Sequence, residues 1–369
     1  MCMLGITTIG CTGSPTAEPS GDARRQEDVS RSDPAPQVAA ADPAEAIAAL
    51  EASGARLKRS DDGLVTDCDL RGVDLEDALA ESLVQLRGLR RLYADRGGFS
   101  REGWEQIGGI STLELLDLRG VSLDNAALAA LVRDLPRLRA LRLSGQNGAT
   151  TVDEEGMAPL ANCPQLRALA LDHLWIGQPG LQKLVDLPHL AELYLAGTLV
   201  DDPALETLSK INTLRKLRLA QTAITADGLQ HLTALPLEDL DISECSQVFD
   251  PAMKPVGKMV TLQRLNLWRD AITDAGVAHL ANLVNLQWLN LDNTQLSDDG
   301  LEHLSNMSRL EFLHLGSTLV SDAGMPRLYG LKSLKDLKVT RTAVTEEGVK
   351  GLIEAIPGLK VQLKYVAGQ

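Results

Sequence analysis

The chain repeats one phrase, which is clearest in three consecutive segments: LNLWRDAITDAGV (residues 265–277), LNLDNTQLSDDGL (289–301) and LHLGSTLVSDAGM (313–325). These segments begin 24 residues apart. Aligning the last apolar residue of each L-x-x-L-x-L core gives 13 positions from Leu70 to Leu363, and eight of the 12 intervals are 24 residues. A fixed period of this length indicates a solenoid whose repeats pack only on their neighbours.

Each repeat contains two kinds of local signal. The alternating leucines predict a short strand with its apolar side chains pointing inward. The following Thr-Asp or Ser-Asp pair, as at Thr273 and Asp274, predicts a capped helix of about ten residues. Between the two, Thr198, Thr222, Thr294 and Thr318 occupy one column, where a hydroxyl is expected to satisfy loop N–H groups. The sequence therefore predicts an α/β solenoid, a curved horseshoe of about 13 repeats with parallel strands on the concave face and helices on the convex face.

Bulk composition excludes several functions. The net charge of −14 disfavours nucleic acid, which requires a basic surface, and direct adsorption to an anionic membrane. No internal stretch approaches the 18 apolar residues of a membrane span. Cys68, Cys163 and Cys245 lie in well-separated repeats, too far apart for a disulfide, and are expected to be buried thiols.

The N-terminus carries a different signal. Residues 1–11 form a short apolar run that ends in Ile9-Gly10-Cys11, which resembles a truncated lipoprotein signal with Cys11 as the lipidated residue. The run lacks a basic segment and is short for a signal peptide, and a start codon assigned too far downstream explains both departures. The alternative is an ordinary tail with an accidental Gly-Cys pair. Residues 12–41, rich in Pro, Ser and Ala, are expected to be a flexible linker.

The folded part is expected to begin with a cap. Asp42 and Pro43 predict the start of a helix over residues 44–52, with Asp42 as its N-cap. Residues 56–59 and 64–67 flank a Ser-Asp-Asp-Gly turn and predict a hairpin. Residues 42–64 are therefore assigned to a cap, and 65–369 to the repeat domain.

The repeat resembles a known class. Its core, with Thr or Cys in the position of a core Asn and T-D-x-G-L at the helix start, is similar to the cysteine-containing subclass of leucine-rich repeats. It is especially similar to bacterial members that carry a lipobox and a Pro/Ser-rich spacer. The resemblance covers about residues 43–366 and implies a protein-interaction scaffold in the cell envelope, with no catalytic residue to transfer.

Side chains between the inward leucines are expected to form three columns on the concave face. These columns hold Tyr93, Tyr194, Trp268, Trp288 and Phe312, five of the 11 aromatic residues. Large rings beside hydrogen-bonding groups and an arginine are typical of interface hot spots. The candidate ligand-binding residues are Arg264, Asn266, Trp268, Trp288, Asn290, Asp292, Phe312 and His314. Two alternatives remain: the rings of adjacent strands only stack on one another, or the register is one residue off.

A second candidate is the loop Gln146–Thr151, which lengthens one interval to 28 residues and is either a ligand contact or an idle insertion. Catalysis has little support: His314 has Asp292 as a neighbour, but Gly316 occupies the place of a nucleophile. We expect no enzyme activity, cofactor or metal. The sequence favours a scaffold that binds a protein or peptide. A glycan-binding protein using the same rings and a purely structural envelope spacer are the alternatives.

Overall fold

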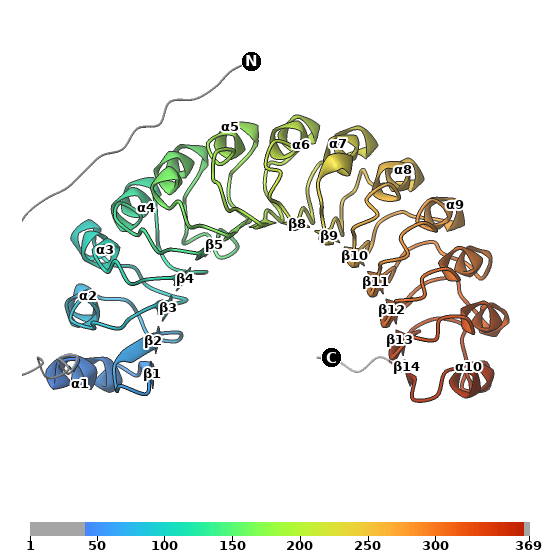
Figure 1. The fold of residues 1–369 in the computed structure, drawn as a ribbon, viewed down its shortest axis with the longest axis horizontal. Helices are drawn as coiled ribbons and strands as arrows, with labels where there is room; N and C mark the ends of the chain where they lie inside the picture. The colour runs from blue at the N-terminus through green and yellow to red at the C-terminus, as the bar shows by residue number, and fades with distance from the viewer. Residues whose placement is uncertain (1–40, 365–369) are drawn as a thin grey trace, which may run out of the picture. The chain divides into compact units, whose positions relative to one another are not determined.

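The structure, a computed structural model, describes residues 41–364. In this part of the chain one continuous sheet lines the inside of an arc, and short helices cover its outside (Figure 1). The sheet has 14 strands, whose spatial order from β1 to β14 is the same as their order in the sequence. Predictions for residues 1–40, including the lipidation of Cys11, lie outside the described residues.

The strands are short and evenly spaced in the sequence. They are β1 Arg56–Arg59, β2 Val65–Asp69, β3 Arg91–Tyr93, β4 Leu115–Asp117, β5 Ala140–Ser144, β6 Ala168–Asp172, β7 Glu192–Tyr194, β8 Lys216–Arg218, β9 Asp239–Asp241, β10 Arg264–Asn266, β11 Trp288–Asn290, β12 Phe312–His314, β13 Asp336–Lys338 and β14 Lys360–Gln362. The strands β2 to β14 are the 13 expected repeat strands, and all of them pair in parallel.

The helices are shorter than expected. The α-helices are α1 Ala44–Ala52, α2 Asp77–Leu83, α3 Arg101–Gly108, α4 Asn125–Leu131, α5 Gln178–Gln182, α6 Asp202–Leu208, α7 Ala226–His231, α8 Met253–Val256, α9 Asp274–Ala278 and α10 Lys350–Ala355. The 3-10 helices are η1 Glu154–Asn162, η2 Leu232–Ala234, η3 Asp250–Ala252, η4 Asp299–Leu304 and η5 Asp322–Leu328. The expected length of about ten residues is thus wrong, because a 24-residue repeat also needs a strand and two connections within its period.

The inward leucines form the core. Leu265, Leu289, Leu313 and Leu337 lie opposite one another on adjacent strands and are fully buried. This confirms the register derived from the repeat. The three cysteines expected to be thiols are free and buried, and burial raises the pKa of Cys68 to about 12 and of Cys163 and Cys245 to about 11.

In the cap segment, α1 is followed by β1, which pairs antiparallel with β2, the first repeat strand. However, Asp42 does not cap α1, whose N-cap is Pro43 and lacks a side-chain hydrogen bond. The buried Asp42 carboxylate instead accepts hydrogen bonds from the backbone N–H of Val65 at 2.6 Å and of Arg87 at 2.7 Å. It therefore ties the cap to β2 and to the end of the first repeat.

The T-D-x-G motif connects neighbouring repeats. Thr273 caps α9 by accepting from the Ala275 N–H, as expected. The Asp274 carboxylate then reaches into the next repeat, where it accepts from the backbone N–H and hydroxyl of Ser297 at 2.8 and 2.5 Å. The same contacts link Asp202 to Thr225, Asp250 to Thr273, Asp298 to Ser321 and Asp322 to Thr345. We call this series the aspartate ladder.

The glycine of the motif makes room for the aspartate ladder. A Cβ atom on Gly300 would collide with the Oδ1 atom of Asp274, and Gly228, Gly276, Gly324 and Gly348 have the same relation to the aspartate of the preceding repeat. The motif thus encodes contacts between repeats as well as a helix start.

The threonine column bonds differently from the expectation. The hydroxyls of Thr198, Thr294 and Thr318 donate to the carbonyl oxygen three residues earlier, at 2.6–2.7 Å. These three satisfy buried carbonyl groups, whereas Thr342 in the same column donates to the Val339 carbonyl and also accepts from the Val344 N–H at 3.3 Å, as expected. The residue just before several of these threonines has a positive φ, as at Asn293 (58°) and Ser317 (53°), and this turn directs its N–H to the next repeat.

Candidate functional site

The predicted aromatic residues lie on the strands of the C-terminal half of the sheet. Arg264, Trp288 and Phe312 are opposite one another on β10, β11 and β12, and Asn266, Asn290 and His314 follow two residues later on the same strands. Both rows alternate with the buried leucines, so they face the concave side. The structure thus brings most of the predicted patch together in the expected register.

The rings form a stack that has a cation at each end. The Trp288 and Phe312 rings are stacked and nearly parallel, with an angle of 5° between their planes and 5.0 Å between their centroids. The Arg264 guanidinium lies 4.4 Å from the Trp288 centroid, and the Lys338 ammonium lies 5.8 Å from the Phe312 centroid. Because these four residues come from β10, β11, β12 and β13 in order, the cations approach from opposite ends. We call this set the concave stack.

His314 lies against the edge of the concave stack. Its ring is 6.3 Å from the Phe312 ring in an edge-on arrangement. Burial is the main cause that lowers the pKa of His314, and Lys338 acts in the same direction, while Asp292 opposes them. The imidazole is therefore neutral at pH 7 and has one donor and one acceptor nitrogen.

The two asparagines are partly occupied by contacts within the chain. The Asn290 side-chain oxygen accepts from the Asp292 N–H at 3.0 Å. The Asn266 amide donates to Asp241 at 3.0 Å, and its oxygen accepts from the Trp268 N–H at 3.3 Å. These amides shape the ends of β10 and β11, and both side chains remain half-buried at the surface.

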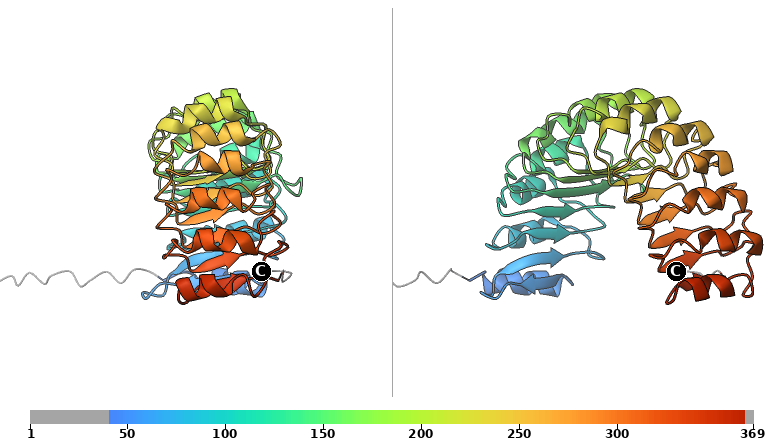
Figure 2. Two further views of the ribbon diagram at one scale, coloured as in Figure 1. Left: turned by 90° about the vertical axis from the view of Figure 1, so that its right-hand side faces the viewer. Right: turned by 45° about the vertical axis from the view of Figure 1, so that its right-hand side comes forward.

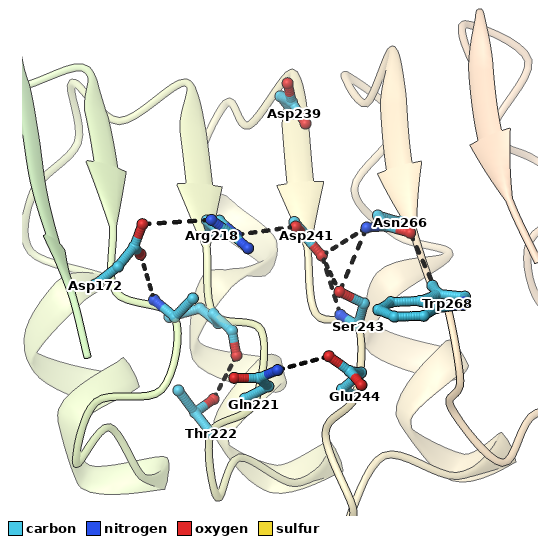
Figure 3. A network of polar contacts seen from close by, with 12 residues as sticks. Asp172, Arg218, Gln221, Thr222, Asp239, Asp241, Ser243, Glu244, Asn266 and Trp268 are labelled. Atoms are coloured by element: carbon cyan, nitrogen blue, oxygen red, sulfur yellow. Dashed lines mark hydrogen bonds and ion pairs between the residues drawn. The ribbon is translucent and has the colours of Figure 1, made fainter. Parts of the chain in front are cut away.

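Trp268 is separate from the concave stack. Its ring contacts the Arg269 guanidinium at 5.3 Å, and within residues 41–364 it makes no ring contact with Trp288. The reason is its position two residues past the end of β10, whereas Trp288 lies opposite Arg264 at the start of that strand. The Trp268 N–H donates to the Asn266 side chain, whose amide donates in turn to the Ser243 hydroxyl at 3.4 Å (Figure 3).

A network of charged residues borders the concave stack. Arg218 on β8 lies 3.3 Å from both Asp172 and Asp241, the second contact being an ion pair without a hydrogen bond (Figure 3). Two further ion pairs join neighbouring strands here. Lys216 on β8 pairs with Glu192 on β7 at 2.8 Å, and Arg264 on β10 pairs with Asp239 on β9 at 3.3 Å. Burial raises the pKa of Asp239.

A small hollow of about 170 Å³ lies between this network and Trp288. Its lining includes Tyr194, Lys216, Arg218, Asp239 and Asp241, none of which the sequence analysis selected as a ligand residue. The sequence does contain a sign of this network, because acidic and basic residues alternate from one strand to the next within a single column. The aromatic residues drew attention because they are rare.

No family model and no curated protein sequence matches the chain. Among solved structures, it is similar to an internalin (InlF) from Listeria monocytogenes, with a TM-score of 0.56, 19% identity, and coverage of 88% of this chain and 94% of that one. The fold is a leucine-rich-repeat solenoid. The plant peptide hormone receptor RGFR1 in complex with RGF2 matches with a TM-score of 0.45, 16% identity and coverage of 84% and 59%. Internalin C2 (InlC2), also from L. monocytogenes, matches with a TM-score of 0.39, 21% identity and coverage of 72% and 92%.

The second candidate site is the loop Gln146–Thr151, which follows β5. It lies between two hollows, one of about 420 Å³ toward the preceding repeats and one of about 380 Å³ toward the following repeat. The loop therefore alters the surface on both of its sides. Among residues 41–364, no helix has the length and apolar character required to cross a membrane.

Proposed function

We propose that this leucine-rich-repeat solenoid is a non-enzymatic scaffold that binds a protein or peptide through strands β10 to β13 of its concave face. The concave stack carries the proposal. Its two rings are half-buried and stack on each other, and a cation lies beside each of them. Rigid aromatic groups bordered by an arginine are typical of binding hot spots.

The stack favours a protein or peptide over a sugar. A sugar ring stacks on a free aromatic face, but Arg264 covers one face of Trp288 and Phe312 lies on the other. The ring edges, the neutral imidazole of His314 and the amide of Asn290 remain as contacts, and they suit backbone and side-chain groups of a peptide. Glycan binding is therefore the second proposal, and a purely structural spacer is the third.

Specificity is proposed to come from Arg264, Asn266, Asn290 and Asp292. Three of these have a fixed orientation, because Arg264 pairs with Asp239 and the two amides bond to strand ends. Trp268 provides a separate contact at the border of the site. No catalytic residue is assigned, because Gly316, the residue next to Asp292 and His314, has no side chain that could act as a nucleophile.

The test is a capture experiment with matched variants. The full chain is immobilised as wild type, as Trp288→Ala, and as Leu319→Ala, which removes an apolar side chain that is 70% exposed and outside the concave stack. Binding of envelope proteins and of a glycan array is then quantified. We expect a protein whose affinity drops about tenfold or more with Trp288→Ala and is unchanged with Leu319→Ala.

Two other results would contradict this proposal. A glycan retained by wild type and lost with Trp288→Ala would replace the peptide ligand by a sugar. Equal retention by all three proteins, or no retention at all, would mean that the rings only stiffen the sheet. Circular dichroism spectra that match among the three proteins establish that folding is unchanged.

We further propose that the scaffold is exported and lipid-anchored to a bacterial envelope. Residues 1–11 are the signal with Cys11 as the acylated residue, 12–41 the tether, 42–64 the cap and 65–369 the repeat domain. Labelling with a palmitate analogue in a bacterial host should mark the wild type and leave Cys11→Ala unlabelled and released from membranes. Equal labelling, or none in either protein, would contradict the anchor.

A further inference from the structure

The loop Gln146–Thr151 leans toward the repeat before it. The Asn147 amide donates to the Gly120 carbonyl at 3.0 Å, the Thr150 hydroxyl donates to the Val121 carbonyl at 2.8 Å, and the Thr151 N–H donates to the Leu123 carbonyl at 2.9 Å. The loop projects from one side of the array (Figure 2). Since its bonds point backward along the array, the surface toward the next repeat is left open.

The open space is the hollow of about 380 Å³, which we call the lateral pocket. Its walls include Gly145, Gly148 and Thr151 from the loop region and His173, Leu174 and Trp175 from the turn after β6. Its volume lies in the range of ligand-binding clefts. Trp175 is 75% exposed, so its indole stands in solvent at the edge of the pocket instead of filling it.

Trp175 continues into an apolar ledge. Leu199 occupies the same position in the next repeat and is 57% exposed, and Ala223 occupies it in the repeat after that. Backbone hydrogen bonds from Leu199 N–H to the Ile176 carbonyl and from Ala223 N–H to the Val200 carbonyl hold these turns side by side. A tryptophan and a leucine exposed next to each other beside a pocket form an unusual apolar surface for a soluble domain.

The border of the ledge is acidic. Asp153 pairs with the backbone of Trp175, and Glu154 and Glu155 follow it at the start of η1. The hydrogen bond from Asn125 is the largest cause that lowers the pKa of Asp153, which is therefore charged at pH 7. On the other side, Asp201 comes two residues after Leu199. One cation lies at this border as well, because the Lys183 ammonium donates to the Glu154 carbonyl at 2.8 Å and acts on Asp153. The acidic side chains outnumber it, so the surface combines an apolar centre with a rim of net negative charge.

We propose that the lateral pocket and ledge bind a second partner, a peptide segment that presents a large apolar side chain flanked by lysine or arginine. The apolar side chain enters the pocket against Trp175, and its neighbours pack on Leu199. The flanking cations meet Asp153, Glu155 and Asp201. This surface consists of turns after the strands, so it is distinct from the concave stack and its ligand.

The probes are three fluorescein-labelled peptides, Lys-Lys-Phe-Leu-Lys-Lys, Glu-Glu-Phe-Leu-Glu-Glu and Lys-Lys-Gly-Ser-Lys-Lys, whose binding to the full chain is followed by fluorescence anisotropy. The first is expected to bind about tenfold or more tightly than the other two. Trp175→Ala should weaken it by about tenfold or more, whereas Trp288→Ala should leave it unchanged. Glu155→Lys, a change at an exposed position, should weaken the first probe and strengthen the second.

Three outcomes overturn the proposal. The first is equal binding of the two lysine probes, which would show attraction to net negative charge alone. The second is binding that survives Trp175→Ala. The third is absence of binding by the first probe at millimolar concentration. Because Trp175 and Glu155 are exposed, neither substitution should disturb folding, and circular dichroism of each variant checks this.

Discussion

Asp270 occupies the threonine column and buries a carboxyl group that is only half-satisfied by hydrogen bonds. Its side chain is 2% exposed, and its Oδ1 atom accepts from the Cys245 N–H at 3.0 Å. Its Oδ2 atom has no hydrogen-bond partner in the described part of the chain. Burial raises the pKa of Asp270 to about 8, so the folded protein holds a proton there at neutral pH.

The consequence is a loss of stability as pH rises. An unfolded Asp titrates near pH 3.9, so between about pH 4 and 8 the folded state binds a proton that the unfolded state has released. The contribution of Asp270 to stability is therefore complete below about pH 4 and is lost as pH rises through 8. At pH 7, about three pH units above the pKa of the unfolded Asp, this loss amounts to about 4 kcal/mol relative to a side chain that never ionises.

Asp270→Asn should recover part of this free energy. The amide oxygen keeps the bond to Cys245, but the NH₂ group lacks a partner, which costs about 1–3 kcal/mol. We expect a net gain of about 2 kcal/mol in the free energy of unfolding at pH 7, and a larger gain at pH 8.5. At pH 4 the gain should disappear or reverse, because the wild-type carboxyl is then neutral in the folded state and largely protonated in the unfolded state.

Urea unfolding followed by far-ultraviolet circular dichroism at several pH values measures this difference. Asp61→Asn, on the exposed hairpin turn, is the control for the loss of one negative charge and should follow the wild-type pH profile. The reasoning is refuted if the unfolding free energies of wild type and Asp270→Asn run parallel across the pH range. It is also refuted if Asp61→Asn gives the same pH-dependent gain.

Two further substitutions test the turns and the aspartate ladder. Ser317→Gly should stabilise the fold by about 0.5–1 kcal/mol, because Ser317 has a φ of 53° that glycine adopts without strain; a lower midpoint in urea would contradict this. Gly300→Ala should destabilise it by about 1–3 kcal/mol, because the new Cβ would collide with Asp274. Gly330→Ala, which has no neighbour closer than 3.9 Å, is the matched control and should be close to neutral, so equal effects at the two glycines would exclude the collision.

The sequence predicted features that depend on period and alternation. The register of all repeat strands and the burial of the leucines were correct, because a shift by one residue would expose every leucine of a strand. The neighbours Trp288 and Phe312 were also found, since they occupy one column at a spacing of 24 residues. Stacking and binding were opposed as alternatives for these rings, but two stacked rings still present their edges to a ligand.

The sequence could not predict features that depend on side-chain choice between competing partners. Asp42 bonds to Val65 and Arg87 rather than to its own helix, and those partners lie 23 and 45 residues away. The direction in which the loop Gln146–Thr151 leans was likewise undetermined, because Gly and Asn residues fit many conformations.

The aspartate ladder and the concave stack belong to the same repeats and lie at different places in them. Asp274 joins the repeat of β10 to that of β11, and Asp298 joins the repeat of β11 to that of β12. These are the strands that carry Arg264, Trp288 and Phe312. Bonds near the convex helices therefore help to fix the spacing at which the concave rings stack, so a ligand meets rings that are already ordered. A ladder variant such as Gly300→Ala should consequently weaken concave binding without touching the ligand.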